Sequence, residues 1–140
     1  KHLRGGLVDV EFIAQYLMLR HAADDPSVLS ANTAEALSRL DRAGHLDADI
    51  AKQLLTALSL WQRLQGVLRL TCEGDFEEDR ATAGQRNLLI RAGGVENFED
   101  LKHLIRQTAV AVHARFDQLI TTPAAPIRAA ESETTQETGP

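Results

Sequence analysis

The sequence predicts an all-α protein, a bundle of about five helices of which two or three are long, followed by a disordered C-terminal tail. Hydrophobic residues make up 44% of the chain but aromatic residues only 4%. Ala and Leu are plentiful and clusters of β-branched residues are few, which favours helix over sheet. Apolar residues recur three and four positions apart in several segments, as on one face of a helix. We therefore expect one helical domain over residues 1–120 and a tail over residues 121–140.

The first predicted helix runs over residues 7–23, after the glycine pair at 5–6. Apolar and acidic residues alternate between positions 7 and 12 as in a half-buried strand, but the run without a turn signal is far longer than a typical strand. The sequence Asp-Asp-Pro at 24–26 ends it, because the residue before proline avoids the helical conformation. Since its side chains are apolar almost all round, this helix is expected to lie in the middle of the domain.

Two further helices are predicted before the midpoint of the chain. Asn32, followed three residues later by Glu35, resembles a capping box and begins a short, peripheral helix that Gly44 stops. Asp47 is expected to cap a long helix that reaches about Cys72 and packs along the first one. The apolar positions of this long helix are Ile50, Leu54, Leu58, Trp61, Leu64 and Leu68.

The C-terminal half contains two more predicted helices after an acidic loop at 73–79. The fourth runs from about Ala81 to Ala92 and is terminated by the glycine pair at 93–94. Asn97 is expected to cap the fifth, whose apolar positions extend to Leu119. From about residue 121 onward, large apolar side chains are nearly absent, so burial cannot offset the entropy lost on ordering.

Charge and composition exclude several classes of function. The formal net charge is -5 with Lys and Arg scattered, which argues against a non-specific grip on nucleic acid. No apolar run approaches the ~20 residues of a membrane span, and no signal peptide is evident. The single cysteine, Cys72, suits a reducing compartment. We expect a soluble, cytoplasmic chain without a membrane partner, and its opening on Lys suggests an excised piece of a longer protein.

The opening stretch carries the candidate functional side chains. These are Lys1, Arg4, Gly5, Gly6, Asp9, Glu11 and Gln15. On a strand Asp9 and Glu11 would share one side and could bind a metal ion together, whereas on a helix they lie about 200° apart. Burying an unpaired carboxylate is costly, so either these acids face a cleft or they make buried polar ties, for example from Asp9 to Arg20 or to a backbone amide.

Other metal and nucleotide motifs are missing from the sequence. The histidines lack the spacing of a helical zinc site, and no Walker-type glycine loop is present. The acids at 47 and 49 stand at a predicted helix start, where they favour the helix dipole rather than a metal ion. No metal site is therefore expected within this chain.

One family resemblance does emerge from the opening stretch. Residues 1–17 read Lys-His-Leu-Arg-Gly-Gly-Leu-Val-Asp-Val-Glu-Phe-Ile-Ala-Gln-Tyr-Leu, which closely resembles the signature of the bifunctional glutamine synthetase adenylyltransferase/adenylyl-removing enzymes. Similarity continues through Leu19-Arg20-His21-Ala22, Asn32-Thr33, Leu37, Gly44 and the helix from Trp61 to Leu70, so it covers about residues 1–119. The Val8-Asp9 pair is similar to the C-terminal, adenylylating half of those enzymes. The PII-uridylyltransferases share the domain type but match less well.

The resemblance implies a helical domain that follows a nucleotidyltransferase domain and forms one wall of its cleft. The whole enzyme would transfer AMP from ATP to a tyrosine of glutamine synthetase, with Mg²⁺ held by acids of the preceding domain. By this resemblance Lys1 would contact triphosphate oxygens, Gly5 and Gly6 would allow a close backbone approach, and Asp9 or Glu11 would position a ligand or the neighbouring domain. No catalytic residue lies in this chain by that reasoning, so the chain alone is expected to be inactive and to bind neither ATP nor Mg²⁺.

A different class of function is compatible with the same residues. The chain could be a non-catalytic helical interaction module that binds glutamine synthetase or a PII-type regulator and contacts no nucleotide. Separate titrations with ATP and magnesium and with glutamine synthetase would distinguish the two hypotheses.

Overall fold

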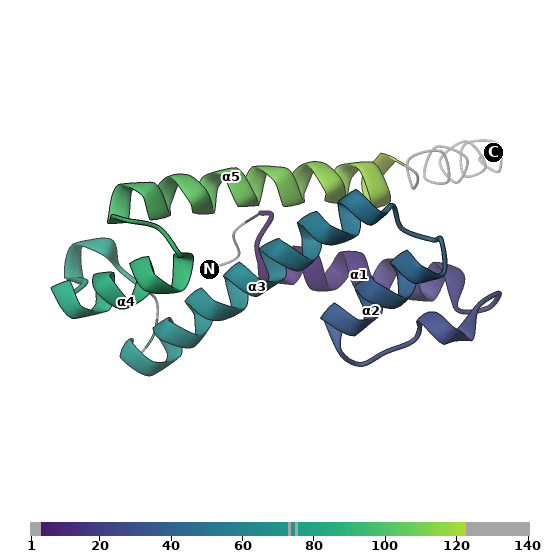
Figure 1. The fold of residues 1–140 in the computed structure, drawn as a ribbon, viewed down its shortest axis with the longest axis horizontal. Helices are drawn as coiled ribbons and strands as arrows, with labels where there is room; N and C mark the ends of the chain where they lie inside the picture. The colour runs from purple at the N-terminus through teal and green to yellow at the C-terminus, as the bar shows by residue number, and fades with distance from the viewer. Residues whose placement is uncertain (1–3, 73, 75, 123–140) are drawn as a thin grey trace, which may run out of the picture.

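The computed structural model describes residues 4–72, 74 and 76–122, and these residues form five α-helices without a strand (Figure 1). The helices are α1 (Leu7–His21), α2 (Thr33–Arg42), α3 (Ala48–Thr71), α4 (Ala83–Gly93) and α5 (Phe98–Phe116). Short 3₁₀ turns occur at Pro26–Val28 and Glu78–Arg80, and a π-helical turn at Asp117–Thr121 continues α5. The predicted all-α bundle is confirmed. Residues 123–140 of the predicted disordered tail lie outside the described part of the chain, and there the tail stays a prediction.

The long helix α3 lies at the centre of the bundle. It contacts α1, α2, α4 and α5, as its length and apolar period predict. The helices α2 and α4 lie toward opposite ends of the molecule, and α5 runs along one side of it (Figure 1). The core therefore extends along α3 and is closed at its two ends by the shorter helices.

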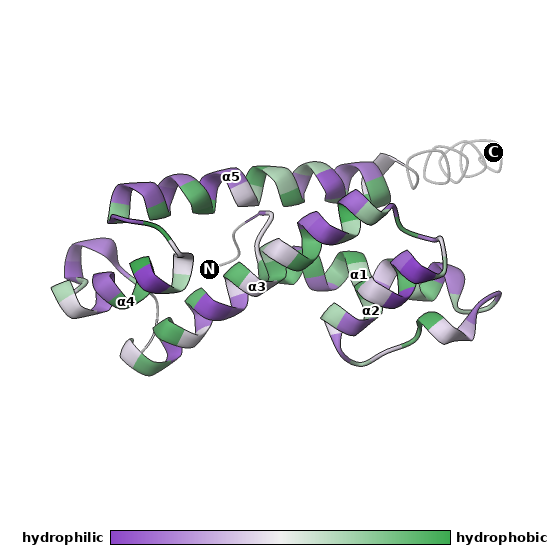
Figure 2. Ribbon diagram, in the orientation of Figure 1, coloured by the Kyte–Doolittle hydropathy of each residue, from purple (hydrophilic) through white to green (hydrophobic). Residues whose placement is uncertain are grey.

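The core consists of side chains at the predicted helical period. The largest fully buried side chains are Ile13, Leu37, Leu40, Leu54, Leu58, Leu101, Val10, Val28 and Val112. They come from α1, α2, α3, α5 and the first 3₁₀ turn, and hydrophobic positions occur on every one of these helices (Figure 2). Burying each large aliphatic side chain contributes about 1.5–3 kcal/mol of free energy to the stability of the fold.

The predicted N-caps of three helices are confirmed. The side chains of Asn32, Asp47 and Asn97 each accept a hydrogen bond from a backbone amide in the first turn of the helix that follows. Thr82 caps α4, which begins slightly later than the predicted Ala81. Only half of the expected capping box forms at α2, because the carboxylate of Glu35 binds arginines of its own helix.

Helix α1 departs from its prediction on one side. Its residues Val10, Ile13, Ala14 and Leu17 are buried as expected. Its opposite side is open: Val8 is 56% exposed, Phe12 48% and Leu19 79%. The expectation of a helix surrounded by its own domain was therefore wrong, because α2, α3 and α5 bury one side of α1 and reach the other only where the ring of Phe116 in α5 lies 5.7 Å from that of Phe12.

Candidate functional site

The glycine pair forms a turn that is locked into the domain. Gly5 has a φ of 83°, and its amide donates a hydrogen bond of 2.5 Å to the Oδ2 atom of Asp9. The indole Nε1 of Trp61 in α3 donates to the carbonyl oxygen of Gly5 at 3.2 Å. A Cβ atom on Gly5 would lie 1.8 Å from the carbonyl oxygen of Ala109 in α5. The close approach that glycine permits here is to the backbone of α5.

Asp9 is tied to the backbone of this turn. Of the two polar ties expected from the sequence, the structure shows the one to a backbone amide, at Gly5. Among the described residues no ion pair joins Asp9 to Arg20. Because α1 is a regular helix, Asp9 and Glu11 project about 200° apart and cannot hold one metal ion jointly. Asp9 thus fixes the entry of the chain into α1.

The side of α1 opposite its buried residues is largely uncovered by the rest of the described chain. We call it the open face, and define it as Val8, Glu11, Phe12, Gln15 and Leu19. These positions follow the helical period on the side opposite the buried residues of α1. Three of them are large apolar side chains with about half or more of their surface exposed. Neither Glu11 nor Gln15 forms a hydrogen bond or ion pair with another described residue. The surface combines apolar area with two polar side chains that the described part of the chain does not engage.

A groove continues this face toward the loop between α1 and α2. It has a volume of about 570 Å³ and is lined by Gln15, Met18, Leu19, Leu29, Ser30 and Ala31. Its lining is mainly apolar, with Leu29 48% exposed. The open face and the groove share Gln15 and Leu19, so they form one continuous surface.

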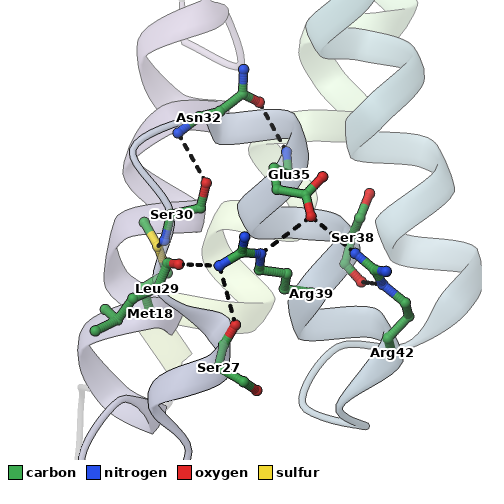
Figure 3. Close-up of polar contacts among 9 residues, drawn as sticks. All are labelled: Met18, Ser27, Leu29, Ser30, Asn32, Glu35, Ser38, Arg39 and Arg42. Carbon is green, nitrogen blue, oxygen red and sulfur yellow. Dashed lines mark hydrogen bonds and ion pairs between the residues drawn. The ribbon is translucent and has the colours of Figure 1, made fainter.

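The loop on the far side of the groove is held in place by α2 (Figure 3). The guanidinium of Arg39 donates to the carbonyl oxygen of Leu29 at 2.5 Å and to that of Ser27 at 3.4 Å. The amide of Ser30 points to the sulfur of Met18 in α1 at 3.4 Å. The hydrogen bond from Arg39 lowers the pKa of Glu35, so that carboxylate stays ionised and orients the guanidinium. The groove is thereby preformed.

The predicted site residues separate into two groups. Gly5, Gly6 and Asp9 build the turn, whereas Glu11 and Gln15 lie on the open face. Arg4 is exposed just before the turn. Lys1 lies outside the described residues.

Sequence reasoning missed the residues that hold these groups in place. Trp61 was expected in the core from its period, but nothing in the sequence indicated that its indole would bind the Gly5 carbonyl. Ala109 and Arg39 were not singled out, although the backbone of Ala109 lies against Gly5 and the guanidinium of Arg39 donates to the Leu29 carbonyl. Such contacts join segments far apart in the chain, and a single sequence carries no signal of that pairing.

Two further observations concern metals and membranes. Within residues 4–72, 74 and 76–122, no three Asp, Glu, His or Cys side chains gather closely enough to hold a metal ion. The helices in this part of the chain also lack the combination of length and hydrophobicity that a membrane span requires.

Comparison with known proteins gives a consistent result. The family model described as GlnD PII-uridylyltransferase matches residues 1–120. The chain is 38% identical over 120 residues to a bifunctional glutamine synthetase adenylyltransferase/adenylyl-removing enzyme of Rhodopseudomonas palustris (strain TIE-1), which covers 86% of the chain and 12% of the relative. The corresponding enzyme of Xanthobacter autotrophicus is 38% identical over 124 residues, covering 89% of the chain and 12% of that protein.

A more distant relative extends the match slightly. The enzyme of the same name from Bradyrhizobium diazoefficiens is 33% identical over 126 residues, 89% of the chain and 13% of the relative. The chain thus spans only about an eighth of the length of these proteins. The resemblance seen in the opening stretch is confirmed, and the chain belongs to the GlnD PII-uridylyltransferase family, in the branch similar to the glutamine synthetase adenylyltransferases.

Proposed function

We propose that this chain is the helical domain that packs on a nucleotidyltransferase domain in a glutamine synthetase adenylyltransferase. In that enzyme it forms one wall of the cleft where AMP passes from ATP to a tyrosine of glutamine synthetase. The open face of α1 is the observation that carries the proposal, because Val8, Phe12 and Leu19 are each about half or more exposed on one side of one helix, and a contiguous apolar patch marks an interaction site. A second domain would cover this surface.

The geometry suggests how the work is divided among the opening residues. Asp9, Gly5 and Gly6 set the entry angle of α1, and Glu11 and Gln15 are the polar groups that α1 presents to the docked domain. Arg4 and Lys1 precede the turn, where positive charges suit the phosphates of ATP. We propose that ATP and Mg²⁺ are bound by the preceding domain, because the one acid of the opening turn, Asp9, is already engaged by a backbone amide.

A matched pair of substitutions tests the docking surface. Leu19 in the last turn of α1 is 79% exposed and Leu70 in the last turn of α3 is 89% exposed. Leu19→Asp and Leu70→Asp therefore introduce the same charge near the same end of a helix, with little loss of burial in the isolated chain. In the longer enzyme Leu19→Asp should lower AMP transfer at least about tenfold, since it places an unpaired charge in a domain interface.

Leu70→Asp is the control for that experiment. Leu70 belongs to the end of α3 that lies near α4, away from the C-terminal end of α1 (Figure 1). Leu70→Asp should leave AMP transfer within about twofold of the unsubstituted enzyme. Equal losses for both variants, or no loss for Leu19→Asp, would count against the open face as the docking surface.

The isolated chain is proposed to lack transferase activity. The resemblance implies that acids on a strand of the preceding domain hold the nucleotide's metal, and this sequence contains no such strand-borne pair. Incubation of the purified chain with ATP, magnesium and glutamine synthetase should transfer no AMP, and detectable transfer would refute this part of the proposal. Binding of glutamine synthetase or a PII-type protein by the chain alone, at the open face, would instead support the interaction module.

A further inference from the structure

A group of three titratable side chains joins the ends of α1 and α2, away from the opening turn. We call His21, Asp25 and His45 the histidine clasp. The rings of His21, in the last turn of α1, and His45, just after α2, stack with centroids 4.1 Å apart and planes 16° apart. The Nε2 atom of His45 lies 3.1 Å from the Oδ2 atom of Asp25, which caps the 3₁₀ turn at Pro26–Val28. Three segments of chain therefore meet here.

The carboxylate of Asp25 is fully used in this arrangement. Its Oδ1 atom accepts hydrogen bonds from the amide of Ser27 at 3.2 Å and from the hydroxyl of Ser27 at 2.5 Å. These bonds, followed by that to His45, lower the pKa of Asp25, so it remains ionised in the range where histidines titrate. Asp25 is thus the anionic partner of the His45 ring.

An imidazolium at His21 would not be compensated in the same way. Burial and then the facing His45 lower the pKa of His21 below its ordinary value of 6.5. Arg20 also lowers this pKa, while Asp24 and Asp25 raise it by less than the sum of the opposing effects. The folded chain therefore binds fewer protons at His21 than the unfolded chain does, and the folded arrangement loses stability as pH falls through 6.5 toward the lowered pKa.

We propose that the histidine clasp is an acid-sensitive latch that holds the α1–α2 loop, residues 22–32, and releases its Asp25 end when His21 is protonated. A charge on His21 disfavours its stacking on His45, and the end of α1 and the turn after α2 separate. The rest of the loop is held by the Arg39 guanidinium, by the Ser30 amide at the Met18 sulfur and by the fully buried side chain of Val28. The latch accordingly opens the loop from its Asp25 end.

The latch would also regulate the surface described above. Leu29, Ser30 and Ala31 of the same loop line the groove beside the open face of α1. Release of the Asp25 end would loosen the support of that side of the groove. This consequence rests on the proposed docking function, whereas the latch itself is a property of the 140-residue chain and is tested on it alone.

Hydrogen exchange at single amides measures the latch directly. The amide of Asp25 donates to the His21 carbonyl at 2.8 Å and the amide of His45 donates to the Leu40 carbonyl at 2.9 Å. Between pH about 8 and about 5, the range in which histidines charge, their protection factors should fall at least about tenfold. The amide of Arg86, which donates to Thr82 in α4 at 3.0 Å, serves as a reference and should keep its protection.

Two variants separate the latch from general acid sensitivity. His21→Phe keeps an aromatic ring in the stack without a titrating group and should abolish most of the loss of protection. His103→Phe changes an exposed histidine of α5 outside the clasp and should behave as the unsubstituted chain. An unchanged loss in His21→Phe would overturn the latch.

The unsubstituted chain provides a second criterion if the variant does not fold. Loss of protection at the reference amide in parallel with the clasp amides would show global unfolding rather than a local release, and would also overturn the proposal. Because no transferase assay is involved, this result is independent of the docking experiment with Leu19→Asp.

Discussion

Gly5→Ala is the substitution that most sharply tests how the opening turn is built. Gly5 combines a left-handed backbone, with a φ of 83°, and a position where a Cβ atom would lie 1.8 Å from the oxygen, 2.6 Å from the carbon and 2.8 Å from the Cα of Ala109. All three are backbone atoms of α5, so no side chain can turn aside to make room. The turn itself must move away from α5.

The expected loss of stability follows from these contacts. A non-glycine residue in the left-handed region costs roughly 1–2 kcal/mol. Displacing the turn also breaks the hydrogen bond from Trp61 and leaves the buried Gly5 carbonyl without a donor, at about 1–3 kcal/mol. Gly5→Ala should therefore lower the free energy of unfolding by about 3 kcal/mol or more, a large part of the roughly 5–15 kcal/mol typical of a domain.

Gly44→Ala is the matched control. Gly44 has a φ of 81°, but nothing lies within 4 Å of the Cβ atom it would gain. Its substitution should cost only the backbone term, roughly 1–2 kcal/mol. Urea unfolding of both variants, followed by circular dichroism, isolates the steric contribution as the difference between them. A difference below about 0.5 kcal/mol would refute the proposed packing of the turn against α5.

Three further substitutions address the same region. Trp61→Phe keeps an aromatic ring in the core but removes the indole donor, and should lower the free energy of unfolding by about 1–3 kcal/mol in urea; an unchanged midpoint would contradict the role of that hydrogen bond. Asp9→Asn weakens a charged acceptor of a backbone amide and should cost about 1 kcal/mol in the same assay. Glu11→Gln should change the free energy of unfolding by less than about 0.5 kcal/mol yet lower AMP transfer by the longer enzyme. A larger loss of stability for Glu11→Gln than for Asp9→Asn would contradict the placing of Asp9 in the turn and of Glu11 on the open face.

Helical periods and caps made most of the fold predictable. The apolar positions of α3 and α5, and the capping residues Asn32, Asp47 and Asn97, carry local signals that tertiary packing did not override. The predicted helices start and end within a few residues of the observed ones. The short α2 was also identified, because its cap and the glycine that follows it are both local features.

The environment of α1 could not be predicted in the same way. Val10 and Phe12 are both apolar, and the sequence alone does not reveal that Val10 is fully buried while Phe12 is half exposed beside Phe116 of α5. The same limit applies to Asp9 and Glu11, because the hydrogen bond to Gly5 depends on a turn whose shape is set by Trp61 and α5. The sequence indicated which side chains of α1 are apolar or acidic, but not which of them point into the core of the domain.

The central claim is that the open face of α1 is covered by a nucleotidyltransferase domain in the longer enzyme. Hydroxyl-radical footprinting of Phe12 and Leu19, in the isolated chain and in that enzyme, measures this coverage directly. The account predicts that modification of both residues falls several-fold in the longer enzyme while modification of Leu70, exposed at the far end of α3, is unchanged. Equal modification of Phe12 and Leu19 in the two proteins would contradict it.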